Sequence, residues 1–267
     1  MPIHHEEQNS ALQLIRKVRE LGIDVPEAVN SESKMYRDTQ REESRAGEAL
    51  RDASSKLATV ALSEFDAAKA ELVSASNRLF AVHNGLGDAL LNVAGERLLK
   101  AVYSATADWE AEAVARFNSI VDEFGLNEVA GDLPNLGDKY SPGVLSLGRE
   151  QGEAVQRWRD AAERLHPLWI VYTTVARLEG HDIGRVTADT RSAGLVLACR
   201  LGHPGTFGVA DAAATTFVAS SEGTDSAKRW GPLVPFVVPA LHGYELHLHT
   251  SSESAAIRLA IQPGAAA

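Results

Sequence analysis

The sequence contains only one cysteine, Cys199, among its 267 residues, so no intramolecular disulfide can form. This excludes a small secreted scaffold held together by disulfides. Apolar stretches of about 20 residues, which a transmembrane helix requires, are also lacking. The first residues, Met1 to Glu7, are polar and do not resemble a signal peptide. We therefore expect a cytoplasmic protein that does not enter a membrane.

Motifs that would identify a reaction are missing as well. There is no Gly-x-Ser-x-Gly nucleophile elbow and no Gly-Lys-Ser/Thr phosphate-binding loop. Cys199 lies in an apolar segment, which favours a buried, inert thiol over a nucleophile. We therefore predict no catalytic residues and no cofactor.

Positive charge is scarce, with 26 Lys and Arg residues against 36 Asp and Glu residues and a net charge of −10. Binding to nucleic acid or to an anionic membrane surface requires clustered positive charge. Neither is an expected partner, and protein partners are favoured instead.

The period of the hydrophobic pattern changes along the chain. A helical repeat predominates up to about residue 185, and short β-type segments with Gly and Pro at turn positions follow. This predicts an α+β fold with a helical bundle of long, coiled-coil-like helices at residues 1–185 and a β-rich domain at residues 186–267. The second domain is expected to be a small antiparallel sandwich or barrel. Its candidate strands are residues 195–201, 206–209, 215–219, 234–238, 244–250 and 256–261.

One helical segment has apolar residues at alternating spacings of three and four, which form a heptad seam. The seam residues are Phe65, Ala68, Leu72, Ala75, Leu79, Val82 and Leu86. A continuous helix over residues 34–83 would be roughly 75 Å long and stable only when packed along its length. We therefore predict a homo-oligomer that associates through this seam. Residues 84–88 contain two glycines and form either a hairpin turn or a kink, after which a helix over 89–124 is expected.

Two further features are candidates for sites. Glu245, His247 and His249 alternate with apolar residues, so in a strand they would share one face and present three metal ligands. An amphipathic strand needs polar residues on its solvent face in any case, and we favour that interpretation. Trp230 precedes a proline-bounded segment and is a candidate contact for a protein partner.

Together these features favour a non-enzymatic structural or assembly protein of the kind found in virions, injection particles or mobile elements. It would oligomerise through its long helices and contact partners through its C-terminal domain. The first alternative is a metal-dependent enzyme that uses Glu245, His247 and His249. The second is an α-helical toxin or pore-former, which would need a longer apolar hairpin than the sequence offers.

Overall fold

The computed structural model describes residues 5–134, 147–181, 190–203, 233, 236–241 and 243–261, and these residues form helices and connecting segments without a β-strand. The chain divides into two compact units. Unit 1 contains Met1–Arg16 and Asp24–Ala105, and unit 2 contains Lys17–Ile23 and Thr106–Ala267. We expected a boundary near residue 185, which lies outside the described residues.

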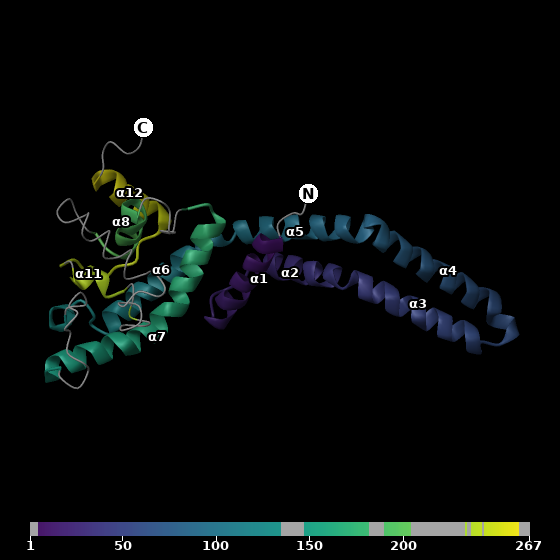
Figure 1. Ribbon diagram of the computed structural model, residues 1–267, viewed down its shortest axis with the longest axis horizontal. Coiled ribbons are helices and arrows are strands. Elements are labelled where there is room, and N and C mark those ends of the chain that lie inside the picture. Colours follow the sequence, from purple (N-terminus) through teal and green to yellow (C-terminus); the bar gives the residue numbers. More distant parts are fainter. Residues whose placement is uncertain are drawn as a thin grey trace. The chain divides into compact units, whose positions relative to one another are not determined.

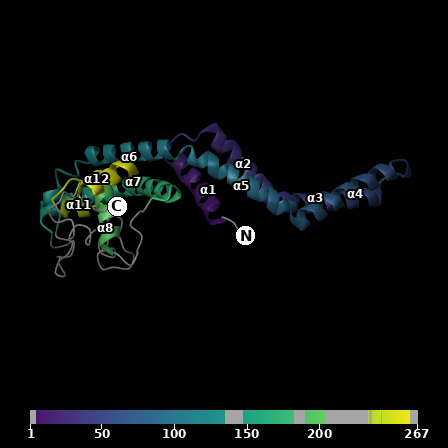
Figure 2. The ribbon, with the colours of Figure 1, turned by 90° about the horizontal axis from the view of Figure 1, so that it is seen from above.

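Unit 1 is built around a long helical hairpin (Figure 1). The outgoing arm consists of α2 (Glu27–Gln40) and α3 (Glu42–Thr59), and the returning arm consists of α4 (Phe65–Ala81) and α5 (Gly87–Tyr103). Helix α3 packs along α4 and α2 packs along α5, as the two perpendicular views show (Figure 2).

The hairpin turns at residues 60–61, so the single helix expected over 34–83 is wrong. Val60 and Ala61 are extended, with ψ angles of 149° and 153°, and the short helix η1 (Leu62–Glu64) leads into α4. This turn contains neither glycine nor proline, so the usual residue signals for a chain reversal are absent from it.

Residues 84–88, whose two glycines disfavour a helix, lie at a kink. Residues Val82–Leu86 make a π-type turn, η2, that joins α4 to α5, with Asn84 and Gly85 outside helical geometry. Gly85 has a φ of 99°, a conformation that favours glycine. Of the two alternatives left open for residues 84–88, the structure therefore shows the kink. A second break, at residues 104–105, divides the helix expected over 89–124 into α5 and α6.

Ion pairs connect the two arms of the hairpin at several levels. Arg97 pairs with Glu32 near the base, Arg78 pairs with Glu42 in the middle, and Lys56 pairs with Glu71 towards the tip, each at 2.6 Å. Exposed pairs of this kind contribute at most about 1 kcal/mol each. Their main effect is to favour one register between the arms.

Helix α1 (His5–Glu20) inserts a buried amide between α2 and α5. Gln8 is 3% exposed and accepts a 2.9 Å hydrogen bond from the Tyr36 hydroxyl of α2. On the other side, a Cβ added at Gly95 of α5 would lie 2.1 Å from the Gln8 amide nitrogen. The absence of a side chain at Gly95 therefore makes room for Gln8.

Alanine at Gly95 is expected to destabilise unit 1, because the new methyl group displaces Gln8 from its contact with Tyr36. Losing a buried hydrogen bond costs about 1–3 kcal/mol, which exceeds the gain in helix propensity of about 1 kcal/mol. Gly47 of α3 is the matched control because no atom lies within 4 Å of a Cβ built there. Thermal unfolding followed by circular dichroism should show Gly47→Ala at or above the wild-type midpoint and Gly95→Ala below it. Equal midpoints for the two variants would contradict the packing described for Gln8.

Unit 2 is built on two packed helices, α6 (Thr106–Glu123) and α7 (Arg149–Leu178). Its core holds large side chains that are at most 1% exposed, namely Trp109, Phe117, Leu126, Trp158, Leu165, Tyr172, Leu201 and Phe236. Arg116 of α6 donates a 2.6 Å hydrogen bond to the carbonyl of Leu21, which fixes the end of α1 within this unit. Helix α7 continues through Pro167.

The expected β-sandwich or barrel over residues 186–267 is wrong. The candidate strands at 195–201 and 256–261 lie in helices α8 (Thr190–Leu201) and α12 (Ser251–Ile261), which pack together. All residues from 195 to 201 are buried. Because the segment has no exposed polar face, its sequence lacks the period of an amphipathic helix and looks the same as that of a buried strand. At 234–238, the described residues 236–237 form a turn and residue 238 begins α11 (Val238–Leu241). The candidates at 206–209 and 215–219 lie outside the described residues.

Candidate functional site

The large apolar side chains that the described chain exposes are concentrated on the hairpin. Seven of the nine lie between residues 62 and 93. We call these seven the hairpin apolar surface: Leu62, Phe65, Val73, Phe80, Leu86, Leu90 and Val93. Val73 and Phe80 are one heptad apart on α4, and Phe80 is 69% exposed. Scattered exposed apolar residues are normal, but such a concentration typically marks an interaction site.

The buried contact inside the outer hairpin is small. Between residues 42 and 81 only Ala46, Ala53 and Ala68 are fully buried. Alanine removes little apolar area from water, so these contacts stabilise the hairpin weakly. Residues 42–81 therefore bury no large apolar side chain completely, whereas Leu62, Phe65, Val73 and Phe80 in the same range are exposed.

The predicted heptad seam lies mainly against α3 of the same chain. Ala68 and Val82 are buried and Leu72, Ala75 and Leu79 are half-buried, whereas Phe65 and Leu86 at the two ends are 42% and 45% exposed. Oligomerisation through the seam stays a prediction, and the exposed ends of the seam form part of the hairpin apolar surface.

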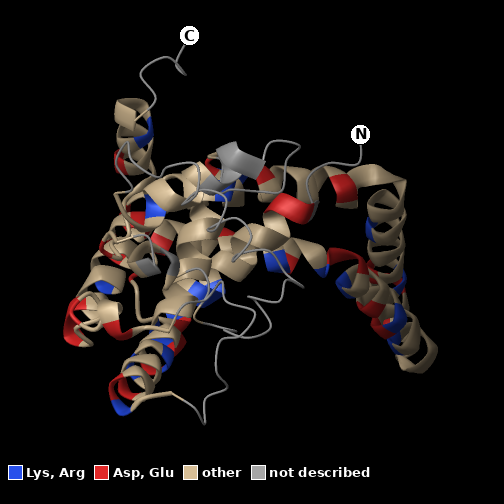
Figure 3. Cartoon of the chain, turned by 60° about the vertical axis from the view of Figure 1, so that its left-hand side comes forward, with Lys and Arg blue, Asp and Glu red and all other residues tan. Residues whose placement is uncertain are grey.

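Charge along the helices is mixed. Lys and Arg residues are interspersed with Asp and Glu residues (Figure 3). Each described helix is either too short or too polar to span a bilayer.

The candidate metal ligands lie on an extended segment that runs between α6 and the end of α8. Leu246 and Leu248 are buried, Glu245 and His247 are exposed and His249 is half-buried, so the faces alternate over residues 245–248, although the described residues contain no strand. The backbone N–H groups of His247 and His249 donate to the carbonyls of Leu201 and Arg200 at 3.1 and 2.9 Å. These are the last carbonyls of α8, which have no partner inside the helix.

Two asparagine side chains take the place of a neighbouring strand on the other side of this segment. Asn118 accepts from the Leu248 N–H at 2.8 Å and donates to the Leu248 carbonyl at 2.9 Å. Asn127 contacts Leu246 in the same way, at 2.8 and 3.2 Å. We call this pair of contacts the asparagine clamp. The sequence pattern gave the extended conformation but could not distinguish an amide side chain from a strand as the hydrogen-bonding partner.

Replacing Asn118 with alanine is expected to release this segment, because both backbone groups of Leu248 lose their partner. Two hydrogen bonds of this kind are worth about 2 kcal/mol in total. Hydrogen exchange should show faster exchange of the Leu248 amide. The control is Ser119→Ala, an exposed position next to Asn118 on α6, which should leave the exchange of that amide unchanged. Unchanged exchange in Asn118→Ala would show that the clamp does not hold the segment.

The metal hypothesis gains no support from this geometry. His247 and His249 have ring centroids 4.8 Å apart, but no group of three or more His, Cys, Asp or Glu side chains within the described ranges is arranged to hold a metal ion. Burial, followed by the neighbouring His247, lowers the pKa of His249 to about 4. The expected absence of a metal stays a prediction.

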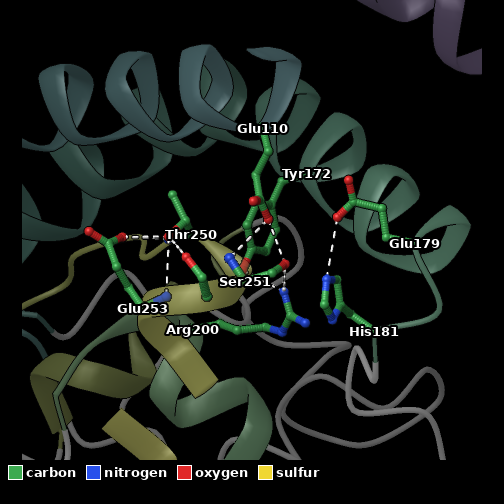
Figure 4. Close-up of polar contacts among 9 residues, drawn as sticks. Glu110, Tyr172, Glu179, His181, Arg200, Thr250, Ser251 and Glu253 are labelled. Atoms are coloured by element: carbon green, nitrogen blue, oxygen red, sulfur yellow. Dashed lines mark hydrogen bonds and ion pairs between the residues drawn. The ribbon is translucent and has the colours of Figure 1, made fainter. Parts of the chain in front are cut away.

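A buried polar cluster connects α6, α7, α8 and α12 (Figure 4). Glu110 of α6 is 8% exposed and accepts hydrogen bonds from the backbone N–H and the hydroxyl of Ser251, at 3.0 and 2.5 Å. Arg200 of α8 donates to the Tyr172 hydroxyl at 2.5 Å and to the Ser251 hydroxyl at 3.3 Å. Burial raises the pKa of Tyr172 to about 12, which keeps this hydroxyl protonated. In the part of the chain that is described, no histidine hydrogen-bonds to Ser251, so the cluster lacks the base that a serine nucleophile requires.

Helix α12 begins with a capping box that our sequence analysis missed. The Thr250 N–H donates to the Glu253 carboxylate at 2.8 Å, and the Glu253 N–H donates to the Thr250 hydroxyl at 3.3 Å. The Thr-x-x-Glu spacing of residues 250–253 was the available signal for a helix start. Glu110, Arg200 and Ser251 had no such signal, because their contacts join positions far apart in the sequence.

The remaining sequence candidates give no site. Cys199 is buried, and burial raises its pKa to about 11, so the thiolate needed for nucleophilic chemistry is disfavoured. Trp230 lies outside the described residues. In comparisons with known proteins, no family model, no curated protein and no solved structure matches this chain.

Proposed function

We propose that this chain is a non-enzymatic assembly protein that self-associates through the hairpin apolar surface. The observation that supports this is the exposure of seven large apolar side chains on a hairpin whose outer part buries only alanines. Two antiparallel helices are half of a four-helix bundle, and a second copy supplies the other half with apolar surface of the same kind. The occupant of the surface is therefore a second copy of this chain.

The interaction of this assembly with other proteins stays a prediction, as does its cytoplasmic location. The same holds for its expected setting in a virion, injection particle or mobile element. No specific contact in the described part of the chain favours the metal-dependent enzyme or the pore-former over assembly.

Lysine at Phe80 is expected to weaken self-association by about 30–100-fold, because it places a charge in the centre of the apolar contact. Leu259→Lys is the matched control, since Leu259 is 47% exposed on α12 of unit 2 and outside the hairpin. Sedimentation velocity at several concentrations measures the dissociation constants, and circular dichroism confirms that both variants remain helical. Equal weakening by the two substitutions, or none by Phe80→Lys, would contradict the proposed interface.

A further inference from the structure

The exposed apolar residues of the hairpin are arranged symmetrically about Ser76 and Asn77 of α4. For each apolar residue before these two positions, another lies at nearly the same number of positions after them. The pairs are Val73 with Phe80, Phe65 with Leu86, Leu62 with Leu90, and Val60 with Val93. The two members of a pair differ by at most two positions, which is about 3 Å along a helix. Val60 is half-buried, and the other members form the hairpin apolar surface.

A two-fold axis at Ser76 and Asn77 would place the members of each pair opposite each other in two copies of the chain. In a two-fold contact, residue i of one copy meets residue j of the other, and residue j of the first copy meets residue i of the second. The two returning arms would then run antiparallel, and each exposed apolar side chain would lie against another one. The apolar pattern of the returning arm is therefore self-complementary.

The charges of the same segment favour the antiparallel orientation over the parallel one. Glu71 and Arg78 pair with the outgoing arm of their own chain. The other Asp, Glu, Lys and Arg residues between positions 60 and 93 are Glu64, Asp66, Lys69 and Asp88. In a parallel pair each of these four would meet its own copy, and like charges in an interface repel. In the antiparallel pair their counterparts are uncharged, namely Ala89, Gly87, Asn84 and Phe65.

The residues at the axis are suited to meeting their own copies. Ser76 and Asn77 are exposed and uncharged, so no charge is placed against the same charge. Arg78, the next residue, lies 2.6 Å from Glu42 of the outgoing arm. Where two packed helices meet at an asparagine, that residue fixes the register of the chains. Asn77 is therefore in a position to fix the register of two hairpins.

A groove of about 380 Å³ lies at the level of Leu90 in unit 1. Met35 of α2 and Leu90 of α5 supply its apolar lining, and the ion-paired Asp38 and Arg45 also line it. The counterpart of Leu90 about the axis is Leu62, whose residue surface is 92% exposed. Grooves of more than about 300 Å³ hold small organic ligands, so this one has room for a leucine side chain.

We propose that two copies of this chain associate antiparallel about a two-fold axis at Ser76 and Asn77. Leu62 of each copy lies in the groove at Leu90 of the other copy, and Val73 packs against Phe80 on both sides of the axis. This arrangement rests on the proposed self-association and adds the orientation, the register and the groove that receives the hairpin turn.

Distances between nitroxide spin labels in the full-length protein, measured by double electron–electron resonance, test the orientation. The variants are Leu62→Cys and Ser76→Cys, and the wild type is the labelling control because its single cysteine, Cys199, is buried. We expect an intermolecular distance of roughly 40 Å at Leu62, since each label lies 14 residues of about 1.5 Å from the axis. At Ser76 we expect less than about 20 Å, because packed helices lie about 8–10 Å apart. Excess unlabelled wild type should remove both distances.

A distance below about 20 Å at Leu62 would overturn the antiparallel arrangement, because two turns lie together only in a parallel pair or in a contact between the tips. If sedimentation shows an oligomer in that sample, the proposed self-association survives and only its orientation is wrong. A monomeric mass without any intermolecular distance would overturn both proposals. Circular dichroism checks that the labelled variants keep their helices.

Aspartate at Asn77 tests the position of the axis. In the proposed pair, Asn77→Asp brings two negative charges together, and we expect self-association to weaken about 5-fold at low salt and to recover at high salt. Asn92→Asp is the matched control, because Asn92 is exposed and its counterpart about the axis is the uncharged Ala61. This control should change the dissociation constant less than about 2-fold. Equal weakening by the two variants in sedimentation velocity would place the axis elsewhere and contradict the proposal.

Discussion

Replacing Glu110 with alanine is expected to lower the free energy of unfolding of unit 2 by about 3–5 kcal/mol. The Glu110 carboxylate accepts from both the N–H and the hydroxyl of Ser251 at the start of α12. Its removal leaves two buried donors without an acceptor next to the buried Arg200 guanidinium. It also takes a negative charge away from a helix N-terminus.

Glu112→Ala is the matched control for this prediction. Glu112 lies two positions further along α6, has a side chain that is 46% exposed, and pairs with Arg116 one turn away. Its loss should cost no more than about 0.5 kcal/mol. Tryptophan fluorescence follows the transition selectively, since all four tryptophans belong to unit 2. Similar losses in the two variants would mean that Glu110 does not stabilise the start of α12.

Acidification from pH 7 to pH 4 is expected to destabilise unit 2 through His249. Burial and the neighbouring His247 lower the pKa of His249 from 6.5 to about 4, while His203 acts in the same direction and Glu253 opposes them. The unfolded chain therefore takes up a proton at a higher pH than the folded chain does. The contribution of neutral His249 to stability is complete above pH 6.5 and is lost as the pH falls towards 4. The free energy of unfolding then decreases by roughly 2–3 kcal/mol.

The variant His249→Gln should remove most of this pH dependence. Other acid-sensitive groups remain in the variant, including Glu253, whose pKa is lowered by hydrogen bonds from Thr250. The free energy of unfolding of the variant therefore still depends on pH, with a smaller slope. His83→Gln in unit 1 is the control, because His83 is exposed and distant in sequence from the extended segment. Urea unfolding, monitored by tryptophan fluorescence at several pH values, gives the slope of the free energy of unfolding against pH for each variant. If His249→Gln kept the wild-type slope, His249 would not be the group responsible.

The parts of the fold that the sequence predicted were those with an amphipathic helical period. Helices α1 and α6 are each followed two residues later by a glycine, Gly22 and Gly125, and both glycines have a positive φ. The hairpin turn at residues 60–61 was missed because no residue there disfavours a helix, so long-range packing between the arms decides its position. Residues 84–88, with two glycines, formed a kink because the helices on both sides pack against the outgoing arm.

The prediction of a β-rich domain was wrong for two physical reasons. Helix α8 is buried along residues 195–201 and therefore shows no amphipathic pattern. The segment at residues 244–250 is extended, as predicted, but it pairs with the asparagine clamp and with the end of a helix. The second outcome depends on contacts between positions that are more than 100 residues apart, such as Asn118 and Leu248, which the period of a single sequence does not encode.

The central claim is self-association of the hairpin, and sedimentation equilibrium of the wild-type protein tests it most directly. The chain has a mass of 28.6 kDa. At micromolar concentration we predict a mass that is a whole multiple of this value and falls towards it on dilution, because the hairpin apolar surface is covered by a second copy. A mass of 28.6 kDa at every concentration up to about 100 μM, which corresponds to less than roughly 6 kcal/mol of association, would contradict the proposed function.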